Sequence, residues 1–139
     1  MPLDEPPAPK SDDLLQRWHS LRQEKPGIRN RDAAEALAVS EAQLISSGLG
    51  EKTIRLQPDW HQLFDRMPKL GKVMALTRNE SAVHEKIGVY DKVVTGDHAS
   101  MALGEQIDLR IFPKVWAHGF AVSKTDGDGQ VRRSLQFFD

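Results

Sequence analysis

The spacing of apolar residues changes near residue 72, and this change limits the folds that the chain can adopt. Before it, apolar residues recur at helical intervals, as Leu14, Trp18 and Leu21 do. After it, apolar and polar residues alternate, and β-branched and aromatic residues are frequent. Helices that precede a run of strands are typical of an α+β protein. We therefore predict N-terminal helices packed on a mostly antiparallel β-sheet meander.

Local signals set the expected ends of these helices. The predicted helices begin near Leu14 and then cover residues 31–38, 41–46 and 59–67. Asp12 or Asp13 is the expected N-cap of the first helix, and Asp59 that of the last. Ser40 and Gln43 have the spacing of a capping box before the third helix.

The strands are predicted from two-residue alternation between turn signals. They cover residues 72–79, 81–88, 105–112, 114–122 and 130–138. Turn residues such as Arg78-Asn79 and Asp126-Gly127-Asp128-Gly129 lie between them. These connections are too short for helical crossovers, so neighbouring strands should be antiparallel.

Length and composition bound the organisation of the chain. Residues 1–10 contain four of the eight prolines and little to bury, so they are expected to form a disordered tail. Residues 11–139 are the right size for a single α+β domain. The last predicted strand runs almost to the final residue, which leads us to expect a fragment of a longer protein.

Composition also excludes several kinds of chemistry. The chain has no cysteine, which excludes disulfides, thiolate metal sites and cysteine nucleophiles. Its formal net charge of −1 gives no general attraction to nucleic acid. No apolar run approaches membrane-spanning length, and the N-terminus lacks the layout of a secretion signal. A cytoplasmic protein without a membrane partner is expected.

His84 is one of two residues with a candidate role in ligand binding. Alternation places it on a strand face with Lys86, opposite the face of Val83 and Ile87. A neutral imidazole is a good ligand for iron, and a macrocycle needs only one or two such ligands. The alternative is a surface histidine on a strand.

Arg110 is the second candidate. Ile107, Leu109 and Ile111 alternate as a core face, so Arg110 and Phe112 share the other face. An arginine beside an aromatic ring can form a cation–π pair or anchor a carboxylate. It can equally be a solvated arginine whose stem covers apolar surface.

Residues 27–50 have the spacing of a helix-turn-helix, which leaves DNA binding as an alternative function. Arg29 and Arg31 precede the first helix, where they could contact phosphates. The second helix, however, begins with Glu41 and carries no lysine or arginine to contact bases. Such corners are also common packing units.

Four stretches resemble the HemS/ChuS-type hemin-degrading, or haem-utilisation, proteins of Gram-negative bacteria. They are "RWHSLRQEKPGIRNRDAAEAL", "LGKVMALTRNESAVHEKIGVY", "IDLRIFPKVWAHGFAV" and "SLQFFD". The resemblance implies a cytoplasmic protein of two similar halves, of which this chain would be the N-terminal half. It also implies that the protein binds haem (iron protoporphyrin IX) and either passes it to a haem oxygenase or takes part in its degradation.

The resemblance further implies roles for particular residues. His84 matches a proposed iron ligand and Arg110 a distal arginine, while the usual axial histidine belongs to the C-terminal half. Lys86, Arg110, Arg132 or Arg133 would then meet the haem propionates, and a platform would come from Phe112, Trp116, Phe120 and Phe138. No catalytic residue is assigned. Two further expectations stay open: a homodimer through an unfinished sheet edge, and a structural half whose haem site needs the missing half.

Overall fold

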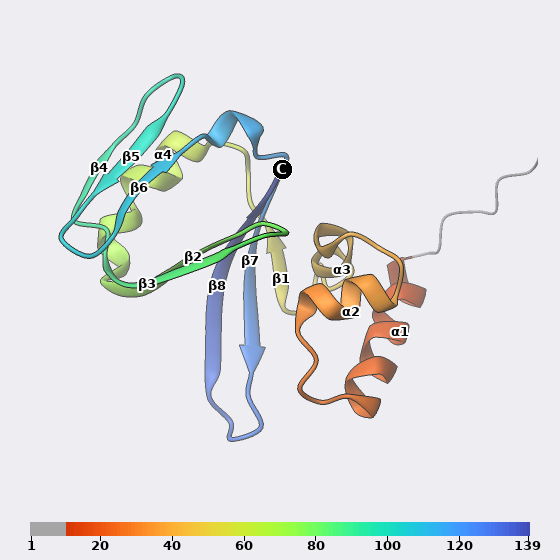
Figure 1. Cartoon of the computed structure of the whole chain (residues 1–139). Coiled ribbons are helices and arrows are strands. Elements are labelled where there is room, and N and C mark those ends of the chain that lie inside the picture. Colours follow the sequence, from red (N-terminus) through yellow and green to blue (C-terminus); the bar gives the residue numbers. More distant parts are fainter. Residues whose placement is uncertain (1–10) are drawn as a thin grey trace, which may run out of the picture. The chain divides into compact units, whose positions relative to one another are not determined.

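The computed structural model describes residues 11–139, so the predicted tail lies outside the described residues. The chain divides into two compact units. The first extends to Leu56 and resumes over His118–Phe138, and the second contains Gln57–Ala117 with the final residue. Both units combine helices with antiparallel strands, so the predicted α+β class is confirmed (Figure 1).

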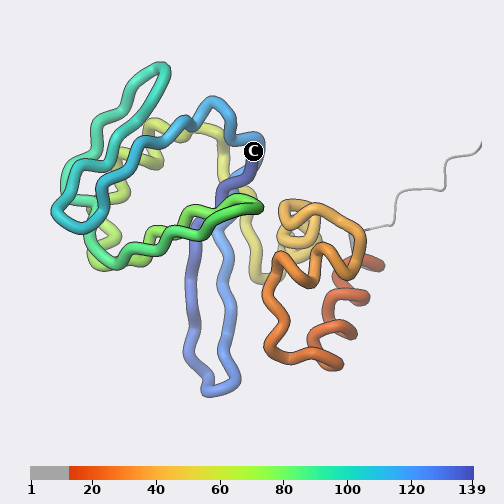
Figure 2. The backbone as a smooth tube through the Cα atoms, in the orientation of Figure 1, coloured from red at the N-terminus to blue at the C-terminus, as the bar shows by residue number. Residues whose placement is uncertain are grey.

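The first unit holds three helices and one three-stranded sheet. Its elements are α1 (Ser11–Glu24), α2 (Asn30–Ala36), α3 (Glu41–Ser46), β1 (Thr53–Arg55), β7 (His118–Thr125) and β8 (Val131–Phe138). The sheet order is β1-β7-β8, and both pairings are antiparallel. Strands β7 and β8 form a long hairpin, drawn as the blue tube in Figure 2. The predicted turn over residues 126–129 closes it, with the amide of Asp126 donating to the carbonyl of Gln130 at 2.8 Å.

The helix ends of this unit test the capping predictions. The capping box is confirmed, because the Ser40 hydroxyl accepts from the Gln43 amide and the Gln43 side chain accepts from the Ser40 amide. The predicted cap at Asp12 or Asp13 is wrong, because α1 begins at Ser11 and both residues lie in its first turn. The three helices meet around a core of Leu14, Trp18, Ala33, Ala34, Leu44, Ile45 and Phe120.

The second unit holds a two-stranded ribbon, a three-stranded sheet and one α-helix. Its elements are α4 (Trp60–Asp65), the 3-10 turns η1 (Met67–Leu70) and η2 (Pro113–Val115), and strands β2 (Lys72–Arg78), β3 (Val83–Val89), β4 (Lys92–Val94), β5 (Ser100–Leu103) and β6 (Asp108–Ile111). The ribbon pairs β2 with β3, and the sheet order is β4-β5-β6. Asp59 caps α4 as predicted, since its carboxylate accepts from the Gln62 amide.

The strand predictions were incomplete in two respects. Strands β1, β4 and β5 were missed because three or four residues give too few positions for alternation to be recognised. The predicted strand over residues 114–122 begins only at His118. Pro113 is the reason, because its fixed φ and missing amide hydrogen suit the first position of the 3-10 turn rather than a strand.

Aromatic rings fill the core of the second unit. Phe64 is only 2% exposed and lies edge-on to Tyr90, with ring centroids 6.2 Å apart. Trp116 lies 6.5 Å from Phe64 and meets Trp60 edge-on at 5.8 Å. Burial raises the pKa of Tyr90 above its usual value, because the phenolate would be poorly solvated there.

Two buried serines should respond oppositely to replacement by alanine. The Ser47 hydroxyl donates to the Leu44 carbonyl at 2.5 Å, whereas the fully buried Ser100 hydroxyl has no partner. Ser47→Ala should therefore lower the free energy of unfolding by about 1 kcal/mol, and Ser100→Ala should leave it unchanged or raise it. Urea denaturation of the two variants measures both effects. A loss at Ser100 as large as that at Ser47 would contradict the assignment.

Candidate functional site

Strand β6 separates two different surfaces of the second unit. Ile107, Leu109 and Ile111 are buried or half-buried, whereas the intervening Asp108 and Arg110 are exposed. This is the alternation expected of a strand with one covered face. The core face predicted for Ile107, Leu109 and Ile111 is therefore confirmed.

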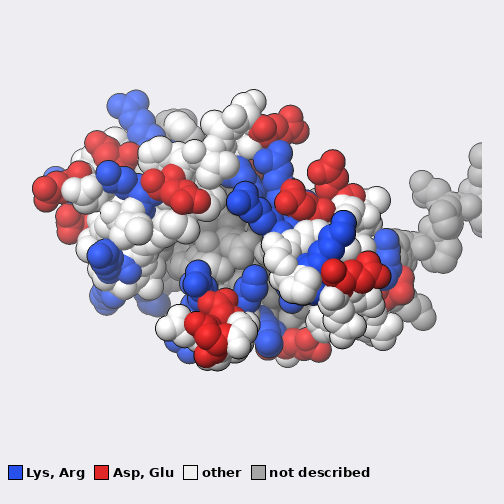
Figure 3. All heavy atoms as spheres, turned by 60° about the horizontal axis from the view of Figure 1, so that its bottom comes forward, with Lys and Arg blue, Asp and Glu red and all other residues white. Residues whose placement is uncertain are grey.

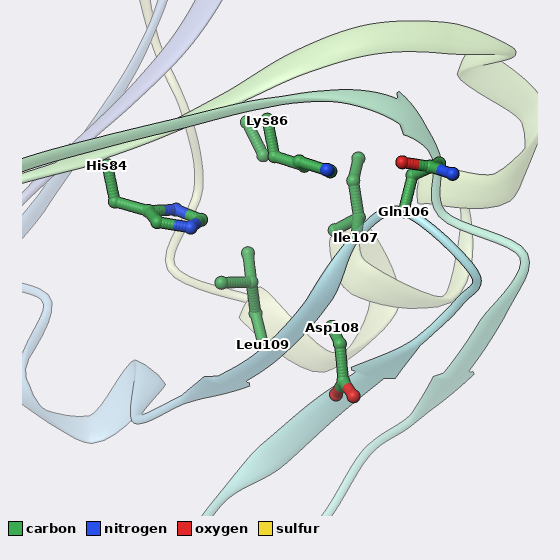
Figure 4. A pocket seen from close by; sticks show the side chains of 7 residues that line it. His84, Lys86, Gln106, Ile107, Asp108 and Leu109 are labelled. Atoms are coloured by element: carbon green, nitrogen blue, oxygen red, sulfur yellow. The ribbon is translucent and has the colours of Figure 1, made fainter.

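A hollow of about 270 Å³ lies on the inner side of β6, between this strand and the ribbon. Its lining residues are Ala75, His84, Lys86, Gln106, Ile107, Asp108 and Leu109. Figure 4 shows His84 and Lys86 projecting from β3 toward Ile107 and Leu109, while Asp108 points the other way. The hollow thus combines an imidazole and an ammonium group with an apolar floor.

The pairing of β2 with β3 in the two-stranded ribbon explains why the side chains of His84 and Lys86 lie on the same face. In the antiparallel register His84 lies opposite Thr77 and Lys86 opposite Ala75, so all four side chains share one face. The opposite face carries Met74, Leu76, Val83 and Ile87, which are 46–58% exposed. The apolar face of this ribbon is therefore uncovered, and the polar one borders the hollow.

Gly88 allows the ribbon to approach the segment before β6. A Cβ atom at this position would lie 2.7 Å from Cβ of Gln106 and 3.3 Å from Cγ1 of Ile107. The first distance is shorter than real Cβ contacts, so only glycine fits here without displacing a neighbour. This close approach near the C-terminal end of β3 brings His84 and Lys86 to the side of β6 on which Ile107 and Leu109 lie.

The outer face of the three-stranded sheet is the second surface. Arg110 lies opposite Met101, and Asp108 lies opposite Leu103. Strand β4 continues the same face with Lys92 and Val94. Phe112 follows β6 directly and is 52% exposed. Here a guanidinium group and an ammonium group lie among apolar side chains that are open to solvent.

The four predicted site residues therefore fall on two surfaces. His84 and Lys86 line the hollow together, whereas Arg110 and Phe112 are not among its lining residues. Alternation along β6 places Arg110 on the side of Asp108, away from Leu109. Val94, Met101 and Leu103 share this outer face with Arg110 and were not singled out from the sequence. The β-branched pair Val93-Val94 before the Thr95-Gly96-Asp97 turn is a sequence signal that could have predicted strand β4.

The predicted aromatic platform is wrong in its inclusion of Phe120, which is buried. Phe120 is 1% exposed and belongs to the core of the helical unit, because β7 turns this side chain toward the helices. Trp116 packs against Trp60 in the other unit. Of the two β8 arginines proposed for propionates, Arg132 forms an ion pair with Asp126 at 2.6 Å.

Positive and negative side chains are mixed on the surface, so the chain has no broad region of one charge on the face shown in Figure 3. Lysine and arginine are interspersed with aspartate and glutamate on the face shown in Figure 3. The formal net charge of −1 agrees with this mixture. An anionic ligand would therefore be attracted by individual groups such as Lys86, Lys92 and Arg110, not by a broad positive field.

Ligand types at these surfaces are limited by the available donors. Among residues 11–139, no group of three or more histidine, cysteine, aspartate or glutamate residues could hold a metal ion. A metal whose other ligands come from a macrocycle is compatible with His84 as a single protein ligand.

The helix-turn-helix spacing corresponds to the α2–α3 pair. Ala33, Ala34 and Leu44 are buried in the core of the first unit, as the packing alternative predicts. Nothing in the described contacts or in the comparisons below supports DNA binding. None of the helices in the described part of the chain has the length and apolar character to span a membrane.

The fold and the two surfaces define an α+β protein that presents nitrogen donors and cationic groups beside exposed apolar side chains. The family model for the haemin-degrading HemS.ChuX domain matches residues 38–139. The chain therefore belongs to the HemS/ChuX family, as the resemblance of its motifs implied.

Curated relatives and solved structures agree with this assignment. The chain is 39% identical over 127 residues to the hemin transport protein HmuS of Yersinia pestis, covering 91% of this chain and 36% of HmuS. It is 35% identical over 130 residues to the hemin transport protein HemS of Yersinia enterocolitica, covering 93% of this chain and 37% of HemS. The crystal structure of holo-PhuS, a heme-binding protein from Pseudomonas aeruginosa, matches with 40% identity and a TM-score of 0.88 over 94% of this chain and 38% of PhuS.

The chain thus spans little more than a third of the length of these relatives. More distant structures, such as that of ChuX with 14% identity and a TM-score of 0.71, share the fold. The matches establish the family and the fold of this chain. They do not establish that it has the activity of the longer proteins.

Proposed function

We propose that this chain is a haem-binding part of a cytoplasmic protein of bacterial haem uptake or utilisation. In this role it would carry haem to a haem oxygenase or take part in haem degradation. Family membership supports the proposal, as do relatives described as hemin transport proteins and as a heme-binding protein. The proposed contacts are His84 and Lys86 at the hollow, with His84 as the iron ligand, and Arg110 and Phe112 on the outer face of the β4-β5-β6 sheet.

The outer face of the β4-β5-β6 sheet is the single observation that carries the proposal. Haem is a flat apolar plate with two carboxylates at one edge, and it gains most of its binding free energy from apolar burial. The exposed side chains of Val94, Leu103 and Phe112 offer apolar area to such a plate. Arg110 and Lys92 lie on the same side and can pair with the carboxylates.

The residues of this chain would bind and orient haem rather than carry out its chemistry. Bound haem supplies the iron and the tetrapyrrole on which redox reactions depend. Arg110 can donate hydrogen bonds in a fixed planar geometry, so it would fix the orientation of the plate. Both surfaces are open to solvent, which suits a carrier that must release its ligand. We propose no catalytic residue.

Titration of hemin into the purified chain tests the proposal. Binding should be saturable, and Arg110→Ala should weaken it about 10- to 100-fold, because a charge-assisted hydrogen bond contributes about 1.5–3 kcal/mol. The matched control is Arg29→Ala, because Arg29 is an exposed arginine just before α2 in the first unit, and this variant should leave the affinity unchanged. Non-saturable uptake of hemin by both variants and the parent would instead support a structural half without a site of its own.

A further inference from the structure

We infer that a second pocket of this chain, lined by two tryptophans, binds the proline-rich segment of residues 1–10. The pocket measures about 350 Å³ and shares no lining residue with the hollow beside His84. Its volume lies within the range of about 300–1,000 Å³ that is typical of ligand sites. The inference concerns a peptide and goes beyond the proposed binding of haem.

Three segments that are distant in the sequence form this pocket. They are residues 58–61 at the start of α4, residues 96–97 between β4 and β5, and residues 113–116 at η2. All three belong to the second unit. The Asp59 carboxylate holds the first segment by capping α4. Gly96 allows a tight turn in the second, because a Cβ atom there would lie 2.6 Å from the Ala99 carbonyl oxygen.

Two indole rings give the pocket an aromatic wall. Trp60 and Trp116 meet edge to face, with ring centroids 5.8 Å apart and ring planes at 81°. Phe64 supports Trp116 from the core, at a centroid distance of 6.5 Å. Pro58 and Pro113 also line the pocket and are conformationally rigid. Grooves lined by aromatic rings are a recurring docking site for proline-rich segments, whose polyproline II conformation costs little entropy to fix.

The first ten residues, "MPLDEPPAPK", have the composition that such a groove binds. They contain four of the eight prolines, and the other four are isolated along the chain. Pro6 and Pro9 have the P-x-x-P spacing of ligands for aromatic grooves. Because polyproline II has three residues per turn, these two rings would face the same side. The chain thus contains its own candidate ligand.

Charges on the segment and in the pocket are complementary. In the segment, the acidic pair Asp4-Glu5 precedes the closely spaced prolines and Lys10 follows them. The pocket carries the carboxylate of Asp97 and the ammonium group of Lys114, both on exposed residues. Lys10 would pair with Asp97, and the acidic pair would pair with Lys114. Complementarity of this kind sets the direction in which a peptide binds.

The indole N–H signals of the full chain in NMR spectra test the inference. The chain has three tryptophans, and Trp18 lies in the other unit, so it serves as an internal reference. The serine variant combines Pro6→Ser, Pro7→Ser and Pro9→Ser. Relative to the parent, this variant should shift the signals of Trp60 and Trp116 and leave that of Trp18 in place. Pro26→Ser, at an exposed proline between α1 and α2, is the matched control and should shift neither pocket signal.

A synthetic peptide with the sequence of residues 1–10 provides the second measurement. Added to the serine variant, it should reverse the shifts of Trp60 and Trp116 and reach saturation. Asp97→Asn in the same background should weaken this binding about 2- to 5-fold, the effect of losing an exposed ion pair.

Either of two results would overturn the inference. One is a serine variant whose Trp60 and Trp116 signals match those of the parent. The other is a response to the peptide that does not saturate. Hemin is absent from both measurements, so neither result bears on the proposed function.

Discussion

Phe64→Ala is expected to lower the free energy of unfolding by about 3–5 kcal/mol. The ring is 2% exposed and contacts both Tyr90 and Trp116 at the centre of the second unit. Its removal takes away apolar burial and two aromatic contacts, and the surrounding rings cannot collapse fully into the space. Since α4 carries Phe64 and packs against β4, the outer face should lose order along with the core.

Urea denaturation followed by tryptophan fluorescence measures this effect, because Trp60 and Trp116 lie in the same aromatic cluster. Phe112→Ala is the matched control: this phenylalanine is 52% exposed and should cost little stability, although it should weaken hemin binding. Equal losses of stability at the two positions would show that the core of this unit has been assigned incorrectly.

Gly88→Ala is expected to be the most disruptive change of a single methyl group near the hollow. The new Cβ would lie 2.7 Å from Cβ of Gln106, which forces the ribbon away from the segment before β6. Overpacking of this kind typically costs about 1–3 kcal/mol. Because the same contact brings β3 close to Ile107, we also expect hemin binding through the proposed ligand His84 to weaken.

Gly127→Ala is the control for this experiment. No atom lies within 4 Å of a Cβ built at Gly127, so the added methyl group should be tolerated. Thermal denaturation and hemin titration of both variants give the comparison. A Gly88→Ala protein with parental stability and an unchanged spectrum would mean that the close approach of β3 does not shape the hollow.

Much of the fold could be predicted from local sequence signals. The change of apolar spacing near residue 72, the Ser40–Gln43 capping box and the turn over residues 126–129 are all confirmed. Each depends on residues that are close in the chain, so the physical cause is visible in a short window. The missed strands β4 and β5 depend instead on pairing with each other and with β6, and a window of three or four residues does not reveal this.

For the candidate site, the sequence predicted which side chains share a strand face, but not how the strands pack together. Alternation correctly placed His84 with Lys86, and Arg110 opposite Leu109, because side-chain direction in a strand has a strict period of two. It could not show whether the face of His84 and the face of Arg110 meet. That outcome depends on how the ribbon lies against β6, which Gly88 permits through contact with Gln106.

The sequence by itself determined the α+β class, the family, and which residues share a strand face, since these follow from spacing along one segment. Only the tertiary structure decided which faces are covered. It left Met74 and Ile87 exposed on the ribbon, and it directed His84 and Arg110 to opposite sides of β6. The physical reason is that burial is a property of segments brought together from distant parts of the chain, and alternation within one strand specifies two faces without specifying what packs on either.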